Sequence, residues 1–261
     1  MIRPRTEKRN DNKKKKKTEE IKKAYDHAHN VGERHHMKVR LQVPEELGYL
    51  TGGTLVDIGC GSGRFLQYFM LTLRKKFCVG LDLSKPTIHA TKNRFTKIGL
   101  DANLIICDAQ KLPFADNTFD VAWSTDMIEH IPSTPKGVHE IVRVSKDKIA
   151  ICVPNKLCPI DMSRVAELLG AHHPPEIENY VTRFQLKRML QNSGIEEETL
   201  VIVEKSFLPI GWLFVNRKIL LPTSLVKFLT SLEVFLEKTP LKYTAGVIVT
   251  CCRKKRFGDR L

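Results

Sequence analysis

Short apolar runs and longer amphipathic runs alternate along the middle of this chain. An apolar run bounded by turn residues is typical of a buried strand, whereas apolar positions three and four residues apart are typical of a helix. Regular alternation of the two predicts a parallel sheet with helices on both faces. The expected strands are 54–58, 77–81, 103–107, 119–124, 147–153, 199–205 and 244–251. The expected helices are 63–75, 84–98, 134–143, 161–170 and 182–191.

The first expected strand runs into the most informative stretch of the sequence, Thr54-Leu-Val-Asp-Ile-Gly-Cys-Gly-Ser-Gly63. An acid, Asp57, is followed by glycines at alternate positions, Gly59, Gly61 and Gly63. Glycine allows positive φ angles and has no Cβ to keep a ligand away from the backbone. The helix that starts near this point turns its free N–H groups toward the carboxyl end of the strand, where open α/β sheets bind ligands.

The spacing of the glycines separates two classes of nucleotide-type ligand. A dinucleotide site has the pattern Gly-x-Gly-x-x-Gly, and Arg64 stands here at the position of the third glycine. Asp57 would repel a pyrophosphate, whereas it suits a cation. S-adenosylmethionine carries an ammonium and a sulfonium group and has no phosphate. The pattern therefore favours S-adenosylmethionine, and a nicotinamide oxidoreductase is the competing interpretation.

Two further acids follow later strands of the expected sheet. Asp82 ends the second strand, 19 positions after Gly63, where a carboxylate accepts both hydroxyls of a ribose. Asp108 follows the third strand, where it can accept from an adenine amine while Ala109 packs against the ring. One such acid alone is more readily explained as a helix cap or turn residue. Three acids in successive units favour a shared site.

These segments together resemble the class I S-adenosylmethionine-dependent methyltransferases, over roughly residues 50 to 205. Three stretches match motifs of that family, namely Val56 to Gly63, Gly80 to Ser84 and Cys107 to Asp120. Glu129-His-Ile-Pro132 and Val153-Pro-Asn155 fit the subgroup that acts mostly on small molecules and lipids. The resemblance implies a Rossmann-like α/β fold, with a seven-stranded, mostly parallel sheet, helices on both faces and an antiparallel last strand.

The same resemblance implies S-adenosylmethionine as the cofactor. The cofactor-binding residues that we predict are Asp57, Gly59, Cys60, Gly61, Gly63, Asp82, Leu83, Asp108, Ala109 and Ser124. Methyl transfer from a sulfonium is an in-line displacement, so the protein mainly has to hold the reacting atoms in line. An acceptor hydroxyl must also lose a proton, for which a general base or a metal is useful.

The candidate catalytic residues follow the fourth expected strand and are Asp126, Glu129 and His130. Their spacing of three and four is expected to place them on one side of a helical turn. Two carboxylates and an imidazole are suitable ligands for a divalent cation, and the segment resembles the Glu-x-x-Glu-His pattern of metal-assisted O-methyltransferases. Asp126 replaces the first Glu and has a shorter reach. We therefore favour a hydrogen-bonding loop without metal, and we interpret His172-His173 as a surface pair.

Charge is concentrated toward the two ends of the chain. The formal net charge is +14, of which residues 1 to 40 carry +8 and residues 251 to 261 carry +4. The run from Lys13 to Lys17 cannot neutralise itself and is expected to stay solvated. Such tails either solubilise the protein or attract anionic lipid or nucleic acid.

The segment before the last strand departs from a minimal domain of this kind. Leu225, Phe228, Leu232, Phe235 and their apolar neighbours recur at helical spacing. This stripe either packs on the sheet or forms a lid whose apolar face contacts a hydrophobic substrate or a membrane interface. The domain division that we predict is a disordered basic tail (1–18), an N-terminal cap helix (19–49), a cofactor-binding core (50–205), an apolar amphipathic insert or lid (206–242), a final strand (243–253) and a basic tail (254–261).

Cysteine usage and hydropathy suggest a compartment. The seven cysteines show no C-x-x-C spacing, and most lie in or beside apolar runs, as expected for reduced, buried thiols. No secretory signal follows Met1, and no stretch reaches the ~20 apolar residues of a spanning helix. We expect a cytoplasmic protein, either free or at the inner membrane surface.

The favoured function is methyl transfer to a small, hydrophobic acceptor such as a prenylated ring or a lipid. One alternative is an RNA methyltransferase that uses the basic tails. Another is a catalytically inactive binding module with a methyltransferase-like fold. The intact glycines and the three acids argue against the inactive module, because a site without function need not keep them.

Overall fold

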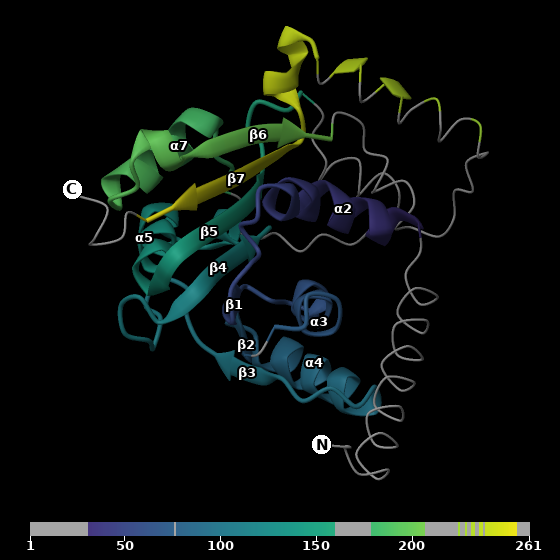
Figure 1. Ribbon diagram of the computed structural model, residues 1–261, viewed down its shortest axis with the longest axis vertical. Coiled ribbons are helices and arrows are strands. Elements are labelled where there is room, and N and C mark those ends of the chain that lie inside the picture. Colours follow the sequence, from purple (N-terminus) through teal and green to yellow (C-terminus); the bar gives the residue numbers. More distant parts are fainter. Residues whose placement is uncertain are drawn as a thin grey trace, which may run out of the picture.

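The structure is a computed structural model, and it describes residues 31–75, 77–159, 179–206 and 238–254, with six further residues between 224 and 236 (Figure 1). Several predictions lie outside the described residues. They are the basic tail 1–18, the first part (19–30) of the cap helix, the helix 161–170, His172-His173, most of the insert 206–242 and all but the first residue of the tail 254–261.

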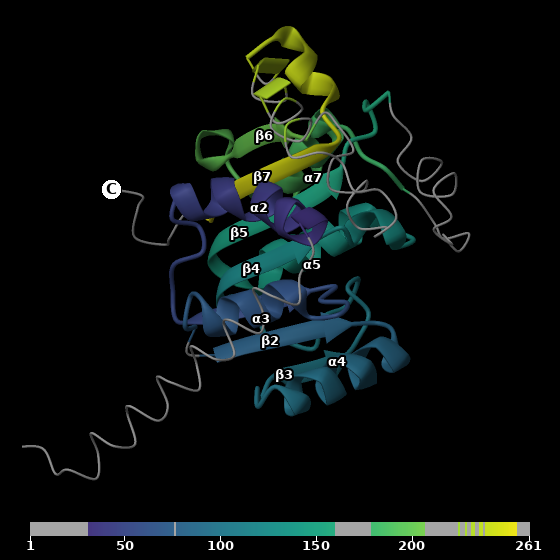
Figure 2. The same ribbon diagram turned by 90° about the vertical axis from the view of Figure 1, so that its right-hand side faces the viewer.

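The described residues form one mixed sheet. Its strands are β1 (Thr54–Ile58), β2 (Phe77–Asp82), β3 (Asn103–Ile106), β4 (Phe119–Thr125), β5 (Ser145–Pro154), β6 (Val201–Lys205) and β7 (Val247–Arg253). They lie in the order β3-β2-β1-β4-β5-β7-β6, which can be followed from β3 upward in Figure 2. All neighbours from β3 to β5 are parallel, and β7 is antiparallel to both β5 and β6. The predicted seven-stranded sheet with an antiparallel last strand is confirmed.

The helices are close to their predicted positions. They are α2 (Val31–Glu46), α3 (Arg64–Leu71), α4 (Lys85–Lys97), α5 (Thr134–Val144) and α7 (Arg183–Asn192), with the 3-10 turns η1 (Ile128–His130), η2 (Glu197–Thr199) and η3 (Pro240–Thr244). The helix α2 continues through Pro44 and ends at Glu46, inside the predicted cap segment 19–49. Backbone bonds from Leu47 to Val43 and from Tyr49 to Pro44 close the end of this helix.

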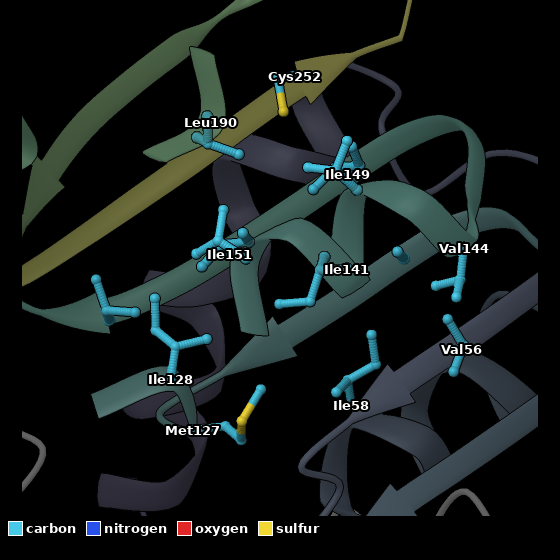
Figure 3. Close-up of a cluster of buried hydrophobic side chains, with 14 of the residues drawn as sticks. Val56, Ile58, Met127, Ile128, Ile141, Val144, Ile149, Ile151, Leu190 and Cys252 are labelled. Atoms are coloured by element: carbon cyan, nitrogen blue, oxygen red, sulfur yellow. The ribbon is translucent and has the colours of Figure 1, made fainter. Parts of the chain in front are cut away.

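The two faces of the sheet bury separate cores, because successive side chains of a strand point to opposite faces. On one face, Val56 and Ile58 of β1 belong to a cluster with Ile141 of α5 and Leu190 of α7 (Figure 3). On the other face, Leu55 belongs to a cluster that is covered by α2, α3 and α4. Helices therefore cover both faces, as predicted.

The alternation on β1 also decides where its acid lies. Asp57 shares a face with Leu55, so its side chain points to the side of α2, α3 and α4. Because β1, β2, β3 and β4 are parallel, their carboxyl ends and the loops that follow them meet at one edge of the sheet. We call this the carboxyl edge.

Among the helices of the described residues, none is long and apolar enough to cross a membrane.

Candidate functional site

The glycine turn after β1 has a backbone that other residues rarely adopt. Gly59, Gly61 and Gly63 have φ angles of 79°, 50° and 71°. A Cβ on Gly59 would lie 2.2 Å from Cγ of Met127, and one on Gly63 would lie 2.8 Å from the ring of Phe95. A Cβ on Gly61 would meet nothing within 4 Å. The first and third glycines are therefore required by packing, whereas the middle one borders open space that a ligand can approach.

Asp82 joins the glycine turn to the turn after β2. Its carboxylate accepts the backbone N–H of Gly61 at 2.9 Å and that of Ser84 at 2.8 Å. The hydroxyl of Thr91, in α4, donates to the carbonyl of Gly61 at 2.9 Å. A carboxylate has about four lone-pair positions, so Asp82 can still accept two hydroxyl groups of a ligand.

Asp57 is the most unusual group at the carboxyl edge. Its side chain is buried, and neither carboxylate oxygen has a hydrogen-bond partner. Burial raises the pKa of Asp57 to about 8, and the charge of Asp82 adds to this, whereas the nearby backbone N–H of Leu66 opposes it without completing a hydrogen bond. A buried carboxylate without a partner is costly. A bound cation would remove that cost, which fits the charge of S-adenosylmethionine.

We call the space at the carboxyl edge beside Asp57, Gly61 and Asp82 the notch. The other predicted cofactor-binding residues differ in how exposed they are around it. Asp108 is exposed and accepts the backbone N–H of Gln110 at 2.8 Å, two residues beyond the end of β3. Leu83 is 69% exposed beside Asp82, and Ala109 is partly buried. Asp57 lies in β1, Asp82 ends β2 and Asp108 follows β3, so the three carboxylates belong to three adjacent parallel strands.

Two other predicted cofactor-binding residues, Ser124 and Cys60, are buried. Ser124 is buried and pairs in register with Ile58, so its side chain points to the face of α5 and α7, away from Asp57. Cys60 is buried in the glycine turn, and burial, followed by the charges of Asp57 and Asp82, raises the pKa of its thiol far above the ordinary range. Cys60 therefore stays a neutral thiol, which suits it to packing rather than to nucleophilic chemistry.

The loop after β4 has a different construction from the one predicted. Asp126 has a φ angle of 49°, and its Oδ1 lies 2.7 Å from Nη2 of Arg40 in α2. The helical turn η1 begins only at Ile128. The prediction that Asp126 shares one side of a helical turn with Glu129 and His130 is therefore wrong. The left-handed backbone turns Asp126 toward α2, 86 residues away in the sequence, where Arg40 neutralises it.

Glu129 and His130 do lie together. Glu129 is 1% exposed, and its Oε1 lies 3.9 Å from Nε2 of His130, whose side chain is 34% exposed. Asn179 fixes this segment from outside, because its backbone N–H donates to the Glu129 carbonyl at 2.7 Å and its side chain donates to the Ile131 carbonyl at 2.9 Å. Within the described ranges, no group of three or more His, Cys, Asp and Glu side chains could hold a metal ion.

A hollow of about 440 Å³ lies beside this segment. It is lined by Pro132, Ser133, Thr134, Pro135, Lys156, Asn179, Tyr180, Val181, Gln185 and Met189. Sequence reasoning missed both this hollow and Arg40. Arg40 lies in the predicted cap helix, but no local signal names a partner so distant in the chain.

Comparison with known proteins agrees with this geometry. A family model described as "Methyltransferase domain" matches residues 56–152. The 27-O-demethylrifamycin SV methyltransferase of Amycolatopsis mediterranei is 30% identical over 36% of this chain and 35% of its own length. The tocopherol O-methyltransferase of Arabidopsis thaliana is 35% identical over 35% of this chain and 26% of its own length. The chain thus spans about a third or less of these curated relatives.

A solved structure extends the likeness to most of the fold. The crystal structure of a putative methyltransferase from Bacillus halodurans has a TM-score of 0.55 with 18% identity, and the match covers 83% of this chain and 99% of that one. The strand order and the glycine turn at its carboxyl edge define a Rossmann-like methyltransferase fold. Residues 56–152 therefore match a methyltransferase domain, and they are similar to the class I S-adenosylmethionine-dependent methyltransferases, whose methyl donor is S-adenosylmethionine.

Proposed function

We propose that this protein transfers a methyl group from S-adenosylmethionine to a small, hydrophobic acceptor such as a prenylated ring or a lipid. The observation that carries the proposal is the buried carboxylate of Asp57, which has no hydrogen-bond partner beside the open side of the glycine turn. A cation held there would be stabilised by a charge that water does not screen. The hydrophobic acceptor is supported by relatives whose names include tocopherol and phthiotriol dimycocerosates.

The residues of the notch have separable roles in this proposal. S-adenosylmethionine, when bound, supplies the electrophilic methyl group and leaves as S-adenosylhomocysteine. Asp57 balances the positive charge, Asp82 accepts the ribose hydroxyls, and Leu83 packs on the adenine. Because these groups are set by strands rather than by long loops, they hold the ligand in a fixed direction.

On the acceptor side we propose His130 as the general base for an acceptor hydroxyl. Its ring is partly exposed and faces the carboxylate of Glu129, which would stabilise the imidazolium that forms when the ring takes the proton. Asp126 is removed from this role because Arg40 binds it. We therefore assign Asp126 to the support of the loop.

Isothermal titration with S-adenosylmethionine and S-adenosylhomocysteine tests the cofactor assignment. We expect binding of both, and we expect Asp82→Ala to weaken it by at least about tenfold, because two charge-assisted hydrogen bonds are lost. Asp101→Ala is the matched control, since Asp101 is an exposed acid before β3, at the opposite end of the strand from the carboxyl edge. Absence of binding, or equal effects of the two substitutions, would remove the assignment.

Transfer of a labelled methyl group to extracted lipids and quinones tests the acceptor class. We expect label in the organic phase, and we expect His130→Gln to lower kcat with little change in the affinity for S-adenosylmethionine. Label found in RNA instead would favour the alternative acceptor. Cofactor binding without transfer to any acceptor would favour a binding module.

A further inference from the structure

Four large apolar side chains are exposed at the end of the carboxyl edge that is formed by β5, β6 and β7. They are Leu157 (44% exposed), Phe184 (69%), Leu241 (55%) and Tyr243 (43%). Leu157 follows β5, Phe184 lies in the first turn of α7, and the other two lie in η3, the yellow turn at the top of Figures 1 and 2. We call these four residues the apolar rim. Single exposed apolar residues are ordinary, whereas a group of this kind marks a contact surface.

Specific contacts join the three segments of the apolar rim. The guanidinium of Arg183 lies 5.0 Å from the ring centre of Tyr243 and 5.8 Å from that of Phe184. The side chain of Asn155 donates to the Tyr243 carbonyl at 3.0 Å and accepts the backbone N–H of Leu157 at 3.0 Å. The rim is therefore built on the core of the sheet.

Among the described residues, cations outnumber acids beside the apolar rim. The described stretches 154–159, 179–184 and 238–246 contain Lys156, Arg183, Lys238 and Lys242, and these stretches contain no acid. Glu204, which lies against them from β6, is buried and is neutralised by Arg183 at 2.7 Å. An apolar surface surrounded by cations is complementary to an anionic lipid surface, which presents hydrocarbon beneath negative headgroups.

The position of the rim also fits a lipid surface. It lies on the same edge of the sheet as the glycine turn, since β5 and β6 run parallel to β1 and β7 starts there. The hollow beside Glu129 and His130 is lined by Lys156 and Gln185, the direct neighbours of Leu157 and Phe184. A molecule that leaves a bilayer at the rim would therefore meet the hollow next.

We propose that the apolar rim docks this protein on anionic lipid membranes, with Lys156, Lys238 and Lys242 at headgroup level. A second copy of the chain is the main competitor for an exposed apolar face. In a two-fold contact the same patch meets itself, so the three lysines would face three others, which opposes a dimer. The inference goes beyond methyl transfer, because docking needs neither cofactor nor acceptor.

Vesicle co-sedimentation of the full chain tests the proposal, with phosphatidylcholine alone and with phosphatidylcholine mixed with phosphatidylglycerol. We expect binding to the mixed vesicles and at least about tenfold weaker binding for Phe184→Ser/Leu241→Ser, since two apolar anchors no longer leave water. Lys242→Glu should weaken binding to the mixed vesicles severalfold and leave the weak binding to neutral vesicles unchanged.

Phe77→Ser is the matched control, because Phe77 is 46% exposed but starts β2 at the opposite edge of the sheet. Binding that is unchanged in the Phe184→Ser/Leu241→Ser variant, or equally weakened by Phe77→Ser, would overturn the proposal. So would a failure of the full chain to bind the mixed vesicles, or a dimer in light scattering that the rim variant abolishes. Circular dichroism of each variant separates loss of docking from loss of folding.

Discussion

The loop after β1 and the loop after β4 lie at the same edge of the sheet, yet they treat charge in opposite ways. Both follow buried strands, and both contain residues with positive φ. The loop after β1 lies beside Asp57, a buried carboxylate without a hydrogen-bond partner. The loop after β4 contains Asp126, which is paired with Arg40 at 2.7 Å. Asp126 therefore already has the positive charge of Arg40 beside it, whereas Asp57 has no such partner for its carboxylate.

This difference separates recognition from support. A carboxylate without a partner lowers the stability of the protein alone and strengthens the binding of a cation. A carboxylate paired with an internal Arg contributes to a fixed loop and has less to offer a ligand. An aspartate thus has a different role at the carboxyl ends of two neighbouring strands: Asp57 is suited to binding a cation, whereas Asp126 supports a loop.

The largest expected effect comes from the packing beneath the glycine turn. Gly59→Ala should lower the free energy of unfolding by about 3 kcal/mol, because a left-handed backbone is combined with a Cβ that would lie 2.2 Å from Met127. Gly61→Ala should cost only about 1 kcal/mol, since the same strain meets open space. Denaturant titration measures both. Equal losses would contradict the view that the middle glycine borders a ligand site.

The ion pair of the loop after β4 is expected to have the next largest effect. Asp126→Asn should lower the free energy of unfolding by about 2 kcal/mol, because it leaves the Arg40 guanidinium, 8% exposed, without its counter-charge. A double-mutant cycle with Arg40→Met should give a coupling of at least about 1 kcal/mol. The exposed pair of Lys187 and Glu197 is the control, and its coupling should stay below about 0.5 kcal/mol.

The stability of the protein without cofactor should depend on pH through Asp57. The pKa of this group is about 8 in the folded protein and about 4 in an unfolded chain, so the folded state keeps its proton longer. The contribution of Asp57 to stability is therefore complete below about pH 4 and is lost as the pH rises toward 8. Denaturant titrations at several pH values should show this loss, and Asp57→Asn should reduce it by at least about 1 kcal/mol.

Cofactor binding should show the opposite trend. Because a cation favours the ionised carboxylate, the affinity for S-adenosylmethionine should rise as the pH approaches about 8, with release of a proton on binding. Titration calorimetry in buffers of different ionisation enthalpy measures that proton. An affinity that is independent of pH in this range would break the contrast between Asp57 and Asp126.

The smallest expected effect concerns a side chain that links the turn after β3 to the segment between β4 and α5. Gln110 donates to the Asp108 carboxylate at 3.2 Å and accepts the backbone N–H of Ser133, at the start of α5, at 3.1 Å. Gln110→Ala should lower the free energy of unfolding by less than about 1 kcal/mol, because these bonds are partly exposed. Thermal denaturation measures the change. A larger loss would mean that the turn after β3 and the segment before α5 depend on each other.

The sequence predicts the sheet and the glycine turn well, because their signals are local. A strand that contains an acid and runs into three glycines carries its own backbone requirement. Asp82 ends β2, and Asp108 lies two residues after β3. Asp126 could not be placed in the same way, since its position depends on one backbone angle and on Arg40, in another element. The sequence also could not predict that the side chains of the apolar rim are exposed together, because they come from three distant segments.

The order of the strands has a consequence for the assembly of the molecule. β7 follows β6 in the chain but lies between β5 and β6 in the sheet. During synthesis, β5 therefore has a free edge of N–H and C=O groups until the ribosome has released β7, and β6 has no neighbour at all. A nascent chain interrupted before Val247 would expose that edge to other chains, so a chaperone that shields it would act at this step.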